Sequence, residues 1–324
     1  MKLILPLLQD GLSYRTALSI QADWYDDHGQ SLAAEALRSQ GRGAAGCFHS
    51  LASGNAAVAW GANEVRQCQV PKGLQAVAVA AGYGHSLALT PEGRVVAWGA
   101  NELRQCRVPP RLRAVAIAAG HNHSLALTPE GRVVAWGRDA HCQCRVPDGL
   151  RAVAIAAGWR HSLAITPDGR VAAWGENSHV PKGLRAVAIA AGWRHSLALT
   201  PEGRVVAWGY NSLHQHPVPD GLRAVAVAAG GCHSLALTPQ GEVVAWGDNS
   251  KYQCRVPDGL KVVAIAAGWQ HSLVLTSEGR AVTWGADEHR QCRVPDGLRA
   301  IAIAAGNCHS LAITSVPPTP QLVR

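Results

Sequence analysis

The apolar and polar positions of this chain follow one pattern that is copied along most of its length. One copy, Arg113 to Leu150, contains the apolar runs 115–118, 123–128 and 133–136, separated by polar segments with glycine or proline. Runs of this length are typical of strands and are short for helices. The pattern therefore predicts three short β-strands followed by a long polar connection.

The copies recur at a nearly constant interval. The tripeptide His-Ser-Leu occurs with its histidine at 49, 85, 123, 161, 195, 233, 271 and 309, and Trp-Gly occurs with its tryptophan at 60, 98, 136, 174, 208, 246 and 284. The histidines are 38 residues apart except for one interval of 36 and one of 34, and both deletions fall in predicted loops. Self-similarity at this period indicates stacked or circular supersecondary units.

Three strands per copy predict an all-β, seven-bladed β-propeller, in which radial repetition leaves only short sheet edges. The carboxyl end supplies two strands, at 300–306 and 309–314, and no Trp-Gly strand, whereas the amino end supplies an early Trp-Gly strand at 58–60. Together these segments complete one blade. Residues 46–53 duplicate 309–314, so an incomplete eighth blade is the alternative.

Three regions are predicted. Residues 1–43 lack the repeat and are rich in Ala, Leu, Glu and Arg, which favours a short helical segment. Residues 44–316 form the propeller, and 317–324 form a disordered, proline-rich tail. We expect no transmembrane helix and no signal peptide, because the apolar run at the start is short. A cytoplasmic monomer is the expectation.

The net charge is +8, from 30 basic and 22 acidic residues. Residues 1–43 hold 4 basic and 5 acidic residues, which leaves 26 and 17 for the rest, so the positive charge belongs to the propeller. This balance favours an acidic partner, and it is too small to indicate nucleic acid.

The recurrent polar residues are explained by symmetry. A metal needs three or four ligands at one point, whereas each copy supplies one His-Ser histidine, so we expect a buried hydrogen bond repeated in every blade. The nine cysteines are expected to be reduced and mostly buried. The Asn or Asp two residues after each Trp-Gly glycine is expected to bond the backbone two residues on. We predict no catalytic residue, cofactor or metal.

The repeated unit Ala-Gly-x-x-His-Ser-Leu-Ala-Leu-Thr-Pro-x-Gly-x-Val-x-Ala-Trp-Gly-x-Asn resembles the regulator-of-chromosome-condensation repeat. Its short period and the Gln-Cys-x-Val-Pro connection resemble the bacterial branch, which includes β-lactamase-inhibiting propellers. The resemblance covers residues 44–314 and implies a seven-bladed propeller that works by protein–protein contact. The segment Ala22-Asp23-Trp24, with Gly29, is similar to a domain found ahead of repeat arrays in planctomycete-type bacteria.

The copies disagree at two positions, between the glycine that ends the first strand and the His-Ser histidine. Symmetry places these pairs in a circle around one mouth of the disc. They are rich in Trp, Tyr, His and Arg, which are enriched in interfaces. The predicted protein-binding residues are Tyr83, His121, Asn122, Trp159, Arg160, Trp193, Arg194, Trp269, Gln270 and Asn307. The competing interpretation is that each ring covers its own blade as packing.

The leading hypothesis is a non-catalytic scaffold that binds an unidentified protein through this ring of turns. One alternative is a propeller enzyme, a lyase or hydrolase, with its site in the central mouth. Another is a basic disc associated with nucleic acid, or a guanine-nucleotide exchange factor. For the nucleic-acid alternative, the turns at the other end of the blades carry Arg94, Arg132, Arg170, Arg204 and Arg280, each with an acidic residue two positions earlier. Local ion pairs are expected there.

Overall fold

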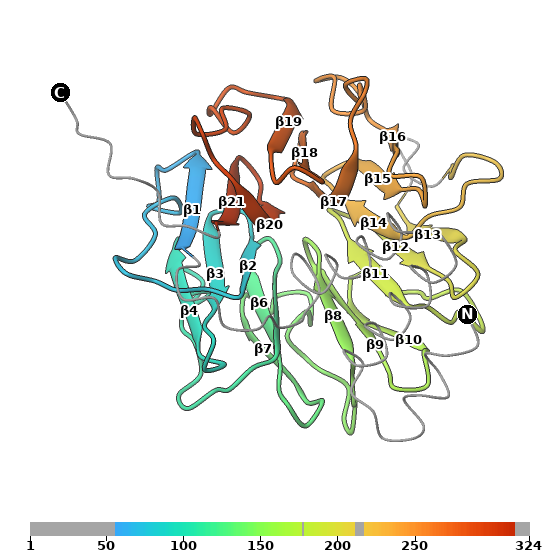
Figure 1. Cartoon of the computed structure of the whole chain (residues 1–324). Coiled ribbons are helices and arrows are strands. Elements are labelled where there is room, and N and C mark those ends of the chain that lie inside the picture. The colour runs from blue at the N-terminus through green and yellow to red at the C-terminus, as the bar shows by residue number, and fades with distance from the viewer. Residues whose placement is uncertain (1–55, 177, 211–216, 315–324) are drawn as a thin grey trace.

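The computed structural model describes residues 56–176, 178–210 and 217–314. They form seven antiparallel sheets of three strands each, arranged in a ring (Figure 1). The predicted seven-bladed propeller is confirmed. The predicted helical segment 1–43, the surplus segment 46–53 and the tail 317–324 lie outside the described residues. No helix in the described ranges is long and apolar enough to cross a membrane.

Each blade has an inner, a middle and an outer strand. The inner strands are β2 (Ala78–Ala81), β5 (Ala116–Ala119), β8 (Ala154–Ala157), β11 (Ala188–Ala191), β14 (Ala226–Ala229), β17 (Val262–Ala267) and β20 (Ala300–Ala305). The middle strands are β3 (His85–Leu89), β6 (His123–Leu127), β9 (His161–Ile165), β12 (His195–Leu199), β15 (His233–Leu237), β18 (His271–Thr276) and β21 (His309–Thr314). The outer strands are β4 (Val95–Gly99), β7 (Val133–Gly137), β10 (Val171–Gly175), β13 (Val205–Gly209), β16 (Val243–Gly247), β19 (Ala281–Gly285) and β1 (Ala56–Gly61). Blades 1 to 6 run in chain order from β2–β4 to β17–β19, and blade 7 consists of β20, β21 and β1.

The ring closes between the two ends of the described chain. Strand β1 pairs antiparallel with β21, in a register that sets Ala56 opposite Thr314 and Gly61 opposite His309. In Figure 1 the blue β1 lies beside the dark red β21. The predicted closure, with the two carboxyl-terminal strands completed by the early Trp-Gly strand, is confirmed.

The strand compositions match their places in the blade. The small side chains of the inner strands line an axial channel, where seven strands crowd together. The middle strands are buried along their whole length, as their apolar sequences require. On the outer strands only the tryptophan is buried throughout the set, and it fills the space between blades. Trp136 of blade 2, for example, packs with Leu87 and Leu89 of blade 1.

The His-Ser pairs connect neighbouring blades in a closed circle. Nε2 of each histidine lies 3.0–3.1 Å from the serine Oγ of the next blade: His85 with Ser124, His123 with Ser162, His161 with Ser196, His195 with Ser234, His233 with Ser272, His271 with Ser310 and His309 with Ser86. Ser124 Oγ donates to the Gln105 carbonyl at 2.9 Å, so the proton of the shared bond belongs to the histidine. The predicted repeated hydrogen bond is confirmed.

Burial keeps six of these imidazoles neutral. It lowers the pKa of His85, His123, His233 and His309 to about 3, and that of His161 and His271 to about 4. The charged form would lose its hydration in the core.

Two expectations about the connections were wrong. In the five described copies, the Asn or Asp two residues after the Trp-Gly glycine bonds the backbone five residues on, as when Asn101 Oδ1 accepts from Cys106 N at 3.0 Å, because it closes the whole loop and not a tight turn. The described thiols are mostly half-buried, with Cys232 buried and Cys142 exposed. The repeated thiol lies on the loop, where Cys106 Sγ donates to the Ala100 carbonyl. No cysteine of the described residues is in a disulfide.

Candidate functional site

The turns between inner and middle strands form one mouth of the axial channel. The first residue of each variable pair borders this mouth: Tyr83, His121, Trp159, Trp193, Gly231, Trp269 and Asn307. Its backbone N–H donates to a carbonyl of the next blade, for example Trp159 N to Gly192 O at 3.1 Å and Asn307 N to Gly82 O at 3.0 Å. Such bonds occur at all seven turns, so a closed ring of backbone hydrogen bonds holds these residues in place.

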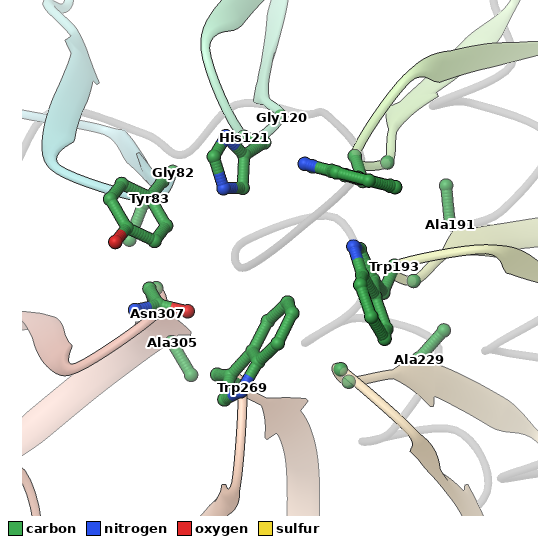
Figure 2. A pocket seen from close by; sticks show the side chains of 18 of the residues that line it. Gly82, Tyr83, Gly120, His121, Ala191, Trp193, Ala229, Trp269, Ala305 and Asn307 are labelled. Carbon is green, nitrogen blue, oxygen red and sulfur yellow. The ribbon is translucent and has the colours of Figure 1, made fainter. Parts of the chain in front are cut away.

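The mouth is a cavity of about 500 Å³, a volume that includes the open solvent at its entrance. Figure 2 shows Tyr83, His121, Trp193, Trp269 and Asn307 around one opening. Its floor is a circle of alanines that it shares with the apolar channel below. A cavity with aromatic walls and few polar groups is typical of a binding site.

The aromatic rings contact one another around the mouth. Tyr83 stacks on His121 with ring centroids 4.1 Å apart, and His121 meets the edge of Trp159 at 6.0 Å. Trp159 and Trp193 are 5.1 Å apart, and Trp193 reaches Trp269 at 4.8 Å. We call these five residues the aromatic arc. Its members come from five blades, so each ring packs on a neighbouring turn instead of lying alone over its own blade.

The second residues of the pairs do not border the cavity. Arg160 and Arg194 lie next to the arc, with the guanidinium carbon of Arg160 3.5 Å from the Trp159 ring centroid. Asn122 Nδ2 lies 2.6 Å from His121 Nδ1 and thereby orients that ring. Gln270 is partly buried beside Trp269. Of the ten residues predicted from the sequence, six therefore meet at the cavity and four lie around it.

Exposed apolar side chains gather on the same face. The loops that follow the outer strands start at this edge, since Ala100 N donates to Gly84 O and Tyr210 N donates to Arg194 O. Among the described residues, the exposed large apolar side chains are one member of the arc and four residues of these loops. They are Tyr83, Val65, Leu103, Tyr210 and Tyr252.

One sector of the mouth is cationic. Burial, together with the nearby guanidiniums of Arg138 and Arg160, lowers the pKa of His121 to about 4. His121 is therefore neutral at physiological pH. Arg194 adds a third guanidinium, while Glu176 is the carboxylate that pairs with Arg160, at 3.0 Å.

Sequence reasoning missed part of this site. Arg138, Glu176 and Tyr210 directly follow the Trp-Gly of three blades. Their side chains interact with residues of the mouth: Arg138 with His121, Glu176 with Arg160 and Tyr210 with Arg194. This position differs between copies as much as the turn pairs do, since it holds Ala, Arg, Glu, Tyr or Asp. The signal that identified the turn pairs would have identified these residues too.

The remaining polar groups do not assemble elsewhere in the described ranges. No group of three or more His, Cys, Asp or Glu residues that could hold a metal occurs there. Burial raises the pKa of Cys68, Cys144 and Cys292 to about 12, so these thiols stay protonated. At the other end of the blades, Arg170 pairs with Asp168 at 2.8 Å, and Arg94 and Arg280 contact acidic neighbours at 3.9 Å, which confirms local pairing in three of the five turns.

This architecture defines a propeller built from one repeated blade. The model of the Regulator of chromosome condensation (RCC1) repeat matches residues 76–105, 114–143, 152–179, 186–215, 224–253 and 262–291. These ranges cover more than half of the chain, which therefore belongs to the RCC1-repeat family. No curated protein matches the sequence.

Solved structures with the same fold are distant in sequence. Prp20p from Saccharomyces cerevisiae is 20% identical with a TM-score of 0.71, and the match covers 84% of this chain and 94% of that one. The ectodomain of the receptor kinase CR4 from Physcomitrella patens is 23% identical with a TM-score of 0.66, over 75% and 71% of the two chains. Human WBSCR16 is 19% identical with a TM-score of 0.62, over 74% and 86%. At these identities the likeness shows the fold alone. The likeness to the bacterial branch, to the β-lactamase inhibitors and to the planctomycete domain stays a prediction.

Proposed function

We propose that this protein is a non-catalytic scaffold that binds another protein with its mouth face, defined as the aromatic arc, Arg160, Arg194 and the adjoining loops. One observation carries the proposal. The exposed large apolar side chains of the described residues lie on the face that also holds the aromatic arc. Such a combination of aromatic rings and arginine is typical of interface centres.

The interpretation that the rings of the arc only pack over their own blades does not explain their exposure. A residue that only covers its own blade would be buried, whereas Tyr83 keeps 48% of its surface exposed while it stacks on His121. The blades are already held together by the tryptophan wedges and by the His-Ser circle. The arc therefore keeps exposed aromatic surface that the fold does not need and that a partner can contact.

The structural neighbours support a binding role for this kind of propeller. Prp20p is described with binding properties to Gsp1p and histones, and another structure holds yeast RCC1 (Prp20) bound to Kap60. Those partners belong to the yeast protein. For this chain they support the class of function, which is protein binding, and not the identity of the partner.

The test compares three forms of the full chain as bait in its native lysate. The mouth variant is Trp159→Ala with Trp193→Ala, and the matched control, on the opposite face, is Arg132→Ala with Arg170→Ala. Quantitative mass spectrometry should find proteins that the wild type and the control retain and the mouth variant loses. Thermal unfolding of the three forms should be similar. Retention of the same proteins by all three would reject the proposal.

A further inference from the structure

Arg160 and Arg194 occupy the same repeat position in neighbouring blades but have different surroundings. Both follow a tryptophan of the aromatic arc. The residue after the Trp-Gly of blade 3 is Glu176, whose Oε2 lies 3.0 Å from Arg160 Nη1. The same position in blade 4 holds Tyr210, and the guanidinium carbon of Arg194 lies 5.5 Å from its ring centroid. Both guanidiniums lie over aromatic rings, but of the two only Arg160 has a carboxylate partner among the described residues.

Arg194 lies among aromatic rings and has no acidic partner in the part of the chain that the structure describes. Its guanidinium carbon lies 4.7 Å from the ring centroid of Trp159 and 5.2 Å from that of Trp193. No carboxylate of the described residues forms an ion pair with it. The carboxylate of Asp248, which follows the Trp-Gly of blade 5, accepts hydrogen bonds from Ser250 Oγ and Gln253 Nε2. The side chain is partly buried, and its Nε, like that of Arg160, has no acceptor within the described structure.

A second donor beside Arg194 is also unused. The indole Nε1 of Trp193 is buried and has no hydrogen-bond partner among the described residues. Its ring lies 5.1 Å from that of Trp159, which Arg194 also contacts. A buried donor without an acceptor costs free energy, and so does a poorly solvated charge without a counter-charge. Arg194 is only partly buried, so a partner carboxylate that reaches its guanidinium would supply the missing counter-charge.

We propose that Arg194 binds an Asp or Glu side chain on a loop of the partner protein, with apolar atoms of that loop filling the aromatic arc. The inference rests on the proposed function and adds the chemistry of the partner. The charge of the sector supports it, because Arg138 and Arg160 both act on His121 and Arg194 lies over Trp159, whereas Glu176 forms its guanidinium ion pair with Arg160. A guanidinium can bind the two oxygens of a carboxylate through two of its N–H groups.

Arg160 provides the matched control for the experiment. Short disulfide-closed random peptides displayed on phage are selected on the full wild-type chain, and the affinities of the selected peptides are measured for Arg194→Gln and Arg160→Gln. The selected loops should contain Asp or Glu, and changing that residue to Asn or Gln should weaken binding about tenfold or more. Arg194→Gln should cause a similar loss that is not additive with the peptide change, whereas Arg160→Gln should cause a smaller one. Arg194→Lys, which keeps the charge but loses the planar edge, should lie between wild type and Arg194→Gln.

The outcomes separate the inference from the proposed function. Loops that need Trp159 and Trp193 but carry no acidic residue, or that bind both arginine variants equally, would overturn the role of Arg194 and leave the binding mouth standing. Loops whose binding does not depend on Trp159 and Trp193 would overturn both the role of Arg194 and the proposed function. Displacement of the peptide by acetate, phosphate or a single-stranded oligonucleotide as effectively as by an acidic loop would show a general anion site and reject the loop as its ligand.

Discussion

Trp193 and Trp269 touch across a blade that lies between them. Their ring centroids are 4.8 Å apart, although they belong to blades 4 and 6, and blade 5 places Gly231 at the equivalent position. A Cβ on Gly231 would lie 3.1 Å from the carbonyl carbon of Trp269 and from Cδ2 of its indole, and would overlap its carbonyl oxygen. The missing side chain therefore makes the aromatic arc continuous at this point.

Gly231→Ala is accordingly expected to destabilise the fold by about 1–3 kcal/mol and to displace Trp269, because the clash involves backbone atoms that cannot turn away. Urea unfolding measures the stability, and tryptophan fluorescence reports the displacement. Gly84→Ala is the control, because its Cβ would meet only side chains of Val65 and Ala100, at 3.1 and 3.4 Å. Equal effects of the two substitutions would contradict the close packing across blade 5.

The two classes of tryptophan should respond differently to truncation. Trp136 is 8% exposed, packs between blades 1 and 2, and donates from Nε1 to the Gln105 carbonyl at 2.9 Å. Trp136→Ala should cost about 3–5 kcal/mol of unfolding free energy. Trp159→Ala should cost clearly less, because that ring borders an open cavity. A loss of similar size for both in denaturant titrations would mean that the mouth tryptophans serve the core.

The contrast between Trp136 and Trp159 also explains how much the sequence could predict. Positions where the copies agree, such as Trp136 and His123, build the disc, because each blade meets its neighbours in the same way. Repetition alone therefore predicted the number of blades, the closure and the circle of turns. The partner of Arg160 is Glu176, which follows another strand of the blade, 16 residues away. The repeat pattern does not show which side chains of such separate segments contact each other. The same holds for the half-buried thiols.

The buried histidines predict an acid-sensitive fold. In the unfolded chain an imidazole has a pKa near 6.5, whereas burial lowers the pKa of six described histidines of the His-Ser circle to about 3 or 4. Between these values the unfolded state binds protons that the folded state does not, so stability is full above pH 6.5 and falls as the pH drops toward 4. Each histidine contributes up to about 1.4 kcal/mol per pH unit.

Urea unfolding at pH 7, 6 and 5 measures this loss of stability. Carboxylates titrate mainly below this range and contribute little to it. Stability that stays constant between pH 7 and 5 would mean that the imidazoles are already charged in the fold or accessible to water.

The closing strand should be the place where a covalent link stabilises the propeller most. Val58 of β1 is opposite Ala312 of β21, and Val134 of β7 is opposite Ala126 of β6 in the same blade register. Paired residues of antiparallel strands lie within reach of a disulfide.

Cysteines at 58 and 312 would close a loop that spans nearly the whole propeller, whereas cysteines at 126 and 134 would close one short hairpin. The entropy lost by the unfolded chain grows with loop length, so the first disulfide should stabilise by about 2–3 kcal/mol more than the second. Thermal unfolding of each variant with and without reductant measures the two gains, and equal gains would mean that the entropy of the unfolded chain does not determine the stabilisation.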